Sequence, residues 1–280
     1  MTINVDTGEL RRQLILSAEE LTPLPAAVTQ LAMVLADAEA TASDVGDVVR
    51  QDPVLTASLL REANSSWVAA NEAIATVERA FILLGRARLL MLAVKDHVDE
   101  QLQPELPQYG LARGELWQHS VAASTAAGVI RDAATHDPGG AVITSALLHD
   151  LGKLVLCDYI DLSSYAGARL DSDLSAIERE LVQIDHGELA GVITRAWGLP
   201  DIITDALIFH HDPEASSDPL AAHAVWLADV VAHQALQPHD ENDGRLGGAA
   251  SDQTDDSLDA LGIDAALPTL VSRTQEFLLA

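Results

Sequence analysis

Apolar residues recur along this chain at the spacing of α-helices, and this periodicity limits the fold more than any other feature of the sequence. Early in the chain, for example, Val28, Leu31 and Leu35 fall on one helical face. No run shows the sustained alternation of apolar and polar residues that is typical of a half-buried strand. Ala and Leu, both strong helix formers, supply much of the 48% apolar content, whereas aromatic residues make up 4%. The sequence therefore predicts an all-α fold.

Proline, glycine and capping residues divide the first hundred residues into short helices. We expect a leader helix within residues 1–21, and Pro25 in the first turn of the next helix, where its missing N–H does no harm. Ser43 is a predicted N-cap, and Pro53 opens a further helix. Gly85 is expected to interrupt the helix that follows.

A stretch rich in proline and glycine, residues 101–114, separates an N-terminal helical subdomain, residues 22–100, from a second helical part, residues 115–235. The second part contains five predicted helices: Glu115–Ala134, Ala141–Ile160, Leu174–Trp197, Ile202–His211 and Pro219–Gln237. Residues 236–257 are rich in Asp, Gly and Ser and are predicted to form a flexible acidic loop. Residues 258–280 regain helical spacing and are predicted to form a C-terminal helical segment.

The charge balance limits the partners. The chain has 16 Lys and Arg against 43 Asp and Glu, a net charge of −27, so nucleic acid is not an expected partner. The first residues lack the apolar core of a signal peptide, and no stretch of about 18 uncharged apolar residues could span a membrane. The single cysteine, Cys157, suits a reducing compartment. We therefore expect a soluble, cytoplasmic protein without a membrane partner.

Five of the ten histidines lie with two aspartates on five successive predicted helices. They are His119, His149, Asp150, His186, His210, His211 and Asp229. A helical bundle can point side chains from several helices into one site. Imidazole and carboxylate groups suit iron, manganese, zinc and similar divalent ions. Two ions about 3.5–4 Å apart could clamp a phosphodiester and activate a water.

Each of these residues also has a plainer explanation. A single buried histidine is more often a hydrogen-bonded core residue than a ligand, and Lys153 could be a solvated surface residue instead of facing a substrate phosphate. Asp229 lies in an apolar run, where a carboxylate is costly to bury without a partner. The other histidines are interpreted as structural or surface residues, although His233 could pair with Asp229 on one helix face. These other histidines are His97, His136, His223, His233 and His239.

Several motifs in order resemble one known family. In the N-terminal half they are Leu24-Pro25, Asp52-Pro53-Val54-Leu55-Thr56, Leu59-Leu60-Arg61-Glu62-Ala63-Asn64-Ser65, Thr76-Val77-Glu78-Arg79-Ala80 and Leu83-Leu84-Gly85. In the second half they are Leu147-Leu148-His149-Asp150-Leu151-Gly152-Lys153, Asp185-His186-Gly187-Glu188-Leu189-Ala190-Gly191, Trp197-Gly198-Leu199-Pro200 and His210-His211-Asp212-Pro213. This set resembles the HDOD branch of the HD superfamily of metal-dependent phosphohydrolases.

The resemblance implies an N-terminal helical subdomain packed on an HD-like helical bundle. It implies an output or adaptor module of bacterial signal transduction whose partners are signalling proteins. It further implies that the five histidines and two aspartates above bind one divalent ion or a pair, with iron or manganese preferred to zinc or magnesium. Asp150 and Lys153 are the expected catalytic residues if the site is active.

One departure limits the inference about activity. The related HD-GYP proteins, which hydrolyse cyclic di-GMP, carry a Gly-Tyr-Pro signature after the double histidine, and here the residues are Asp212-Pro213-Glu214-Ala215. Our first hypothesis is therefore a signalling module that works through protein contacts. The alternative is a metal-dependent phosphohydrolase with a nucleotide or cyclic dinucleotide ligand. A helical scaffold with relic histidines is the third hypothesis.

Overall fold

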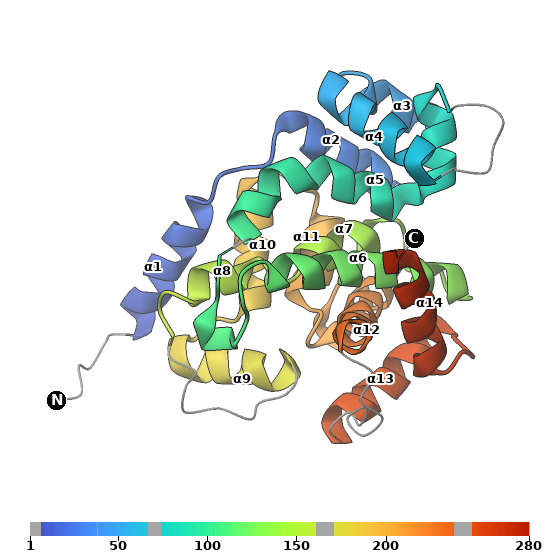
Figure 1. Ribbon diagram of the computed structural model, residues 1–280. Helices are drawn as coiled ribbons and strands as arrows, with labels where there is room; N and C mark the ends of the chain where they lie inside the picture. Colours follow the sequence, from blue (N-terminus) through green and yellow to red (C-terminus); the bar gives the residue numbers. More distant parts are fainter. Residues whose placement is uncertain are drawn as a thin grey trace.

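Helices make up the architecture throughout the part of the chain that the structure describes, namely residues 7–37, 39–66, 74–102, 104–160, 171–237 and 248–279. In this computed structural model those residues contain no strand, and their one isolated β-bridge joins Leu106 and Leu111 (Figure 1). The predicted all-α fold is confirmed. None of the described helices is both long and apolar enough to cross a membrane.

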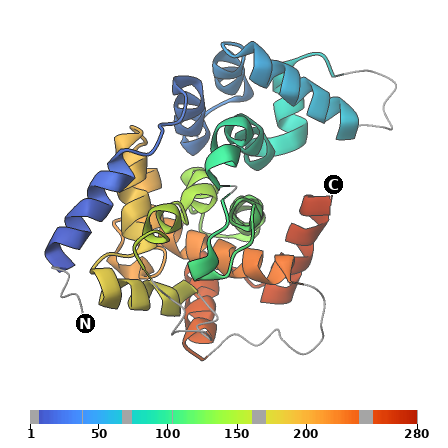
Figure 2. The same ribbon diagram turned by 60° about the vertical axis from the view of Figure 1, so that its left-hand side comes forward.

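The N-terminal half consists of five helices. They are α1 (Thr7–Glu19), α2 (Ala26–Ala36), α3 (Ala42–Val49), α4 (Pro53–Ser66) and α5 (Val77–Leu102). Helices α2 to α5 pack on one another at one end of the molecule, whereas α1 lies apart from them against α8 and α10 (Figures 1 and 2). The expected leader helix is therefore part of the folded bundle, with Leu14 and Ala18 fully buried.

Local residues explain the helix boundaries in this half. Helix α3 begins at Ala42 because Thr41 is its N-cap, and Thr41 and Asp44 exchange side-chain and backbone hydrogen bonds in a capping box. The prediction that Ser43 is the N-cap was wrong by two residues. Gly85 interrupts α5 as predicted, because its φ of 78° and ψ of 177° are not helical.

After α5 the described chain continues with α-helices and short 3-10 helices as far as Leu236. They are η1 (Pro107–Tyr109), α6 (Glu115–Ala133), α7 (Ala141–Leu148), α8 (Gly152–Leu156), α9 (Asp171–Val182), α10 (His186–Ala196), α11 (Asp201–Ile208), η3 (Pro213–Ala215) and α12 (Pro219–Leu236). Helix α12 runs through the middle and packs against α6, α7 and α11. Two of the predicted helices are broken in two. The first breaks between α7 and α8 and the second between α9 and α10, where Gln183 has a φ of 60° and Asp185 caps α10.

The acidic segment near the C-terminus was predicted to be a flexible loop over residues 236–257, and its second half is helical. Helix α13 (Gly248–Leu261) packs against α12 and buries Thr254 and Ser257, and α14 (Leu267–Leu279) follows and packs on α6 and α12. The sequence of α13 contains few apolar residues, so α13 depends on its contact with α12. Residues 238–247 lie outside the described part of the chain.

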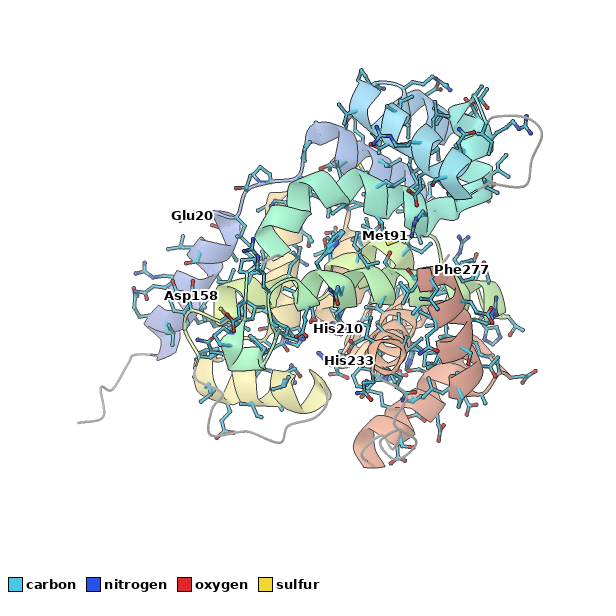
Figure 3. All side chains as sticks on the ribbon, in the orientation of Figure 1. Glu20, Met91, Asp158, His210, His233 and Phe277 are labelled. Carbon is cyan, nitrogen blue, oxygen red and sulfur yellow. The ribbon has the colours of Figure 1, made fainter. Side chains whose placement is uncertain are left out.

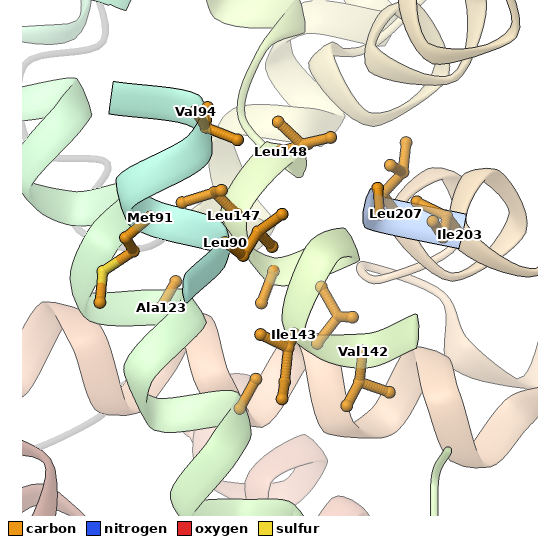
Figure 4. Close-up of a cluster of buried hydrophobic side chains, with 14 of the residues drawn as sticks. Leu90, Met91, Val94, Ala123, Val142, Ile143, Leu147, Leu148, Ile203 and Leu207 are labelled. Carbon is orange, nitrogen blue, oxygen red and sulfur yellow. The ribbon is translucent and has the colours of Figure 1, made fainter. Parts of the chain in front are cut away.

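One continuous hydrophobic core joins the two halves. At the junction, Leu90 and Val94 of α5 face Leu147 and Leu148 of α7 (Figure 4). Arg86 adds a polar contact between α5 and α2, because its guanidinium donates hydrogen bonds to backbone carbonyls at the end of α2. The N-terminal helices are therefore packed directly on the helices that carry the histidines.

Candidate metal centre

The fold brings all seven predicted ligand residues to one place. They lie in the second turn of α6 (His119), at the end of α7 (His149 and Asp150), at the first residue of α10 (His186), just after α11 (His210 and His211) and in α12 (Asp229). Six of them are buried, and His211 is partly buried. The predicted convergence of these side chains is found in the structure.

A close backbone contact sets the position of the His149-Asp150 pair. Helix α7 ends at this pair, and α8 begins at Gly152. A Cβ at Gly152 would lie 2.0 Å from the backbone oxygen of His186, so only glycine fits. This contact brings the end of α7 against the first turn of α10.

Short distances connect the side chains of the centre. His119 Nε2 lies 2.9 Å from Asp229 Oδ1 and 3.4 Å from His149 Nε2. Asp150 Oδ1 lies 3.6 Å from His149 Nε2 and 3.5 Å from His186 Nε2, and His186 Nε2 lies 2.9 Å from His211 Nε2. Asp150 therefore stands between the histidines of α6 and α7 and those of α10 and the segment after α11.

Three histidines are held so that Nε2 faces the centre. In each, Nδ1 lies within hydrogen-bonding distance of a fixed oxygen: the carbonyl of Ala146 at 2.8 Å for His149, the carbonyl of Leu207 at 2.6 Å for His210, and the carboxylate of Glu178 at 2.7 Å for His186. An imidazole that donates from Nδ1 keeps a lone pair on Nε2, as a metal ligand requires. Nε2 of His210 is buried and has no hydrogen-bond partner, which fits a position facing an ion.

The electrostatics of the centre also fit a bound cation. Burial, assisted by the nearby His149 and His186, lowers the pKa of His210 to about 3, so this imidazole is neutral. Burial disfavours the charge of His186, but the Glu178 carboxylate raises its pKa to about 9, so a metal ion at Nε2 would displace the proton carried there. Burial also opposes ionisation of Asp229, yet the neighbouring histidines hold its pKa well below the usual range. Buried carboxylates that stay ionised need positive charge close by.

Lys153 supplies part of that charge. Its Nζ lies 2.8 and 2.9 Å from the two oxygens of Asp150, and its side chain is almost fully buried. Its interpretation as a solvated surface residue is therefore wrong. It also lies 5.7 Å from the centre of the Tyr109 ring.

The sequence interpretation left three further residues outside the centre. His233 was assigned to the structural group, but its Nδ1 lies 3.0 Å from Asp229 Oδ1, and its ring centre lies 4.3 Å from that of His119. Glu178 and Tyr109 were not singled out, yet the Glu178 carboxylate accepts hydrogen bonds from His186 and from the Tyr109 hydroxyl. His210 and His233 are both labelled near the middle of the bundle in Figure 3.

Two groups of donors at this centre could each hold an ion. One consists of His186, His210 and His211, and the other of His119, Asp229 and His233; within each, the ligand atoms lie within 4.8 Å of one another. His119, His149 and Asp150 form a third set that overlaps the second. Nitrogen and oxygen donors without thiolates suit iron, manganese or zinc.

The fold and the centre define an all-helical protein of the HD type. The family model of the HDOD domain matches residues 21–213, more than half of the chain, and the chain belongs to this family. No curated protein sequence matches the chain.

Solved structures share the fold. An HDOD domain protein of unknown function from Geobacter sulfurreducens has a TM-score of 0.66 at 23% identity, over 97% of this chain and 94% of that one. A protein from Marinobacter aquaeolei VT8, provisionally named a signal transduction protein, has a TM-score of 0.64 at 21% identity, over 99% of this chain and 65% of that one. A protein from Shewanella amazonensis SB2B, provisionally named a metal-dependent phosphohydrolase, has a TM-score of 0.54 at 14% identity, over 96% and 99% of the two chains.

Proposed function

We propose that this chain is an output module of bacterial signal transduction that acts through contacts with signalling proteins and is built around a divalent-metal centre. The observation that carries the proposal is the closure of the centre. His149, His186 and His210 have no exposed surface. A catalytic metal site keeps an open position for substrate, whereas a structural site is closed. The neighbour provisionally named a signal transduction protein supports this role.

In this proposal the chain's own residues prepare the centre. Glu178 and the carbonyls of Ala146 and Leu207 orient three imidazoles, and Lys153 partly neutralises Asp150. A bound divalent ion supplies the positive charge that holds neutral imidazoles and carboxylates from different helices together. Because the donors are imidazoles and carboxylates, iron and manganese are the first ions to test.

The second candidate is a metal-dependent phosphohydrolase that acts on a nucleotide or cyclic dinucleotide. It is favoured by the two groups of donors on either side of Asp150, an arrangement that a pair of ions could use to clamp a phosphodiester. In that case Asp150 would supply a carboxylate ligand, and Lys153 would exchange its contact with Asp150 for one with a phosphate oxygen. The neighbour provisionally named a metal-dependent phosphohydrolase supports this alternative.

Metal analysis tests the centre itself. Protein purified without chelator is expected to contain stoichiometric iron or manganese, and His149→Ala is expected to lose it. Circular dichroism of the variant controls for folding. Wild-type protein without metal in the presence of added iron and manganese would leave only the scaffold hypothesis.

Hydrolysis assays separate the two candidates. The metal-loaded protein is tested on bis(p-nitrophenyl) phosphate, nucleotides and cyclic di-GMP, with Asp150→Ala as the control. We expect no turnover, and a pull-down from the native host is then expected to recover a signalling protein. Turnover that disappears in Asp150→Ala would replace the output-module proposal with the phosphohydrolase.

A further inference from the structure

A second site lies away from the histidine centre, in a cavity of about 410 Å³ between α5, α6 and α14. Met91 of α5 and Phe277 of α14, both on its wall, are labelled near each other in Figure 3. The cavity shares no residue with the centre. Gly128 on its wall is nine residues beyond His119 in α6, about 13 Å along the helix. A volume of this size is typical of small-molecule sites, which often lie where two parts of a protein meet.

The wall is mainly apolar, with a cluster of arginines. Met91, Val129, Ile143 and Phe277 supply apolar surface. Among the described residues, three arginines and one acidic residue line the cavity. The arginines are Arg86, Arg88 and Arg131, and the acidic residue is Asp132. In a chain of net charge −27, this is a local concentration of positive charge.

Two of these arginines have acidic partners outside the cavity wall. Arg88 pairs with Glu62, and Nε of Arg131 pairs with Asp137 at 3.2 Å. The contact of Arg131 uses one of its five N–H groups, so its guanidinium can accept a second anion. Asp137 is largely exposed, which weakens its hold on the arginine.

The charge of Arg86 is not neutralised by its hydrogen-bond partners. Its guanidinium donates to the carbonyl oxygens of Leu35, Asp37 and Ala40, which are dipoles and not anions. Burial, followed by repulsion from Arg131, lowers the pKa of Arg86, and the carboxylates of Asp37 and Asp137 offset part of this shift. A further anion between Arg86 and Arg131 would relieve the remaining repulsion.

We propose that this cavity binds a small amphipathic anion, with its apolar body against Met91, Val129 and Phe277 and its single acidic group facing Arg86 and Arg131. The ligand is distinct from the nucleotide considered for the centre, because apolar walls and Asp132 disfavour a polyanion. The cavity lies where the N-terminal helices meet the bundle, so the ligand stabilises that junction. This site is independent of the proposed function.

A pair of fluorescent probes tests the proposal. 8-Anilinonaphthalene-1-sulfonate is an amphipathic anion, and N-phenyl-1-naphthylamine has nearly the same aromatic body without the sulfonate. Both are titrated into the full chain in the presence of EDTA, so that metal at the histidine centre plays no part. We expect one saturable sulfonate site, at least about tenfold tighter than the neutral probe, as one charge-assisted contact provides.

Gly128 allows a sharp test of the location. A Cβ at Gly128 would meet nothing within 4 Å, so the side chain in Gly128→Leu begins in open space and can extend into the cavity from α6. Gly128→Ala is the matched control, because it makes the same backbone change and leaves the space. We expect Gly128→Leu to abolish sulfonate binding and Gly128→Ala to keep it. Arg131→Gln is expected to weaken the sulfonate about tenfold and to leave the neutral probe unchanged.

Two results with the variants would overturn the proposal. One is sulfonate binding by a folded Gly128→Leu variant as tight as that of the wild type, because the probe would then sit elsewhere. The other is an unchanged sulfonate affinity in Arg131→Gln, which remains informative if Gly128→Leu does not fold. Equal affinity for the charged and neutral probes would likewise remove the case for an anion.

Discussion

Replacing Glu178 by glutamine is expected to weaken manganese binding at the histidine centre by about ten- to a hundredfold, the usual cost of losing a partner that orients a ligating histidine. The Glu178 side chain has no exposed surface. Its Oε2 accepts hydrogen bonds from the backbone N–H and from Nδ1 of His186, at 2.8 and 2.7 Å, and its Oε1 accepts one from the Tyr109 hydroxyl at 2.7 Å. This one carboxylate therefore determines how His186 faces the centre.

The magnitude can also be worked from these bonds. Glutamine can turn its amide oxygen to His186 and its amide N–H to the hydroxyl oxygen of Tyr109, so the contacts remain and the charge is lost. A hydrogen bond to a charged group contributes about 1.5–3 kcal/mol and a neutral one about 0.5–1.5 kcal/mol, so two weakened bonds to His186 amount to about 2 kcal/mol. This corresponds to about thirtyfold in affinity.

Calorimetric titration of manganese into chelator-treated protein measures the effect. Glu188→Gln is the matched control, because Glu188 is partly buried in α10, the helix that begins at His186, and the same charge is removed. The rise in Tm on adding manganese should shrink in Glu178→Gln and not in the control. Unchanged affinity in Glu178→Gln, beside tight binding by the wild type, would refute the reasoning that this carboxylate orients His186.

Three further substitutions test other parts of the structure. Gly152→Ala forces a Cβ against the His186 backbone and is expected to lower the free energy of unfolding by about 1–3 kcal/mol and to reduce metal content. Denaturant titration and metal analysis measure the two effects. Stability and metal content equal to those of the wild type would contradict the close contact. His233→Ala leaves the other donors in place and is expected to reduce metal content less than His149→Ala does, whereas an equal loss would make His233 a principal ligand. Leu90→Ala at the junction of the two halves is expected to lower the free energy of unfolding, measured in urea, by about 2–5 kcal/mol. A decrease below about 1 kcal/mol would mean that the junction is loosely packed.

Helix positions could be predicted wherever local residues determine them. Pro53 begins α4 and Gly85 breaks α5, because the backbone of each residue imposes the change by itself. The break after α9 carries a local signal, the N-cap Asp185 followed by Glu188, which the sequence interpretation did not use. The break after α7 depends on a contact between distant segments, Gly152 against the His186 backbone. Helix α13 was missed for the same reason, because it is stabilised where it packs on α12.

The candidate centre could be predicted as far as residue type and order allow. Histidines on successive helices of one bundle can share a site, and the motifs of the family indicated which ones do. Glu178 could not be found in this way, because a glutamate in a polar helix looks like a solvated residue until the fold brings it against His186. His233 did carry a signal, its position one helical turn after Asp229, and the structure gives that pairing a place at the centre.

The position of α12 has a consequence for how a displacement of the C-terminal helices can affect the histidine centre. This helix contains Asp229 of the centre, and α13 and α14 both pack against it. A displacement of α13 and α14 can therefore reach the centre through α12, which carries Asp229, and through α6, which carries His119 and also contacts α14.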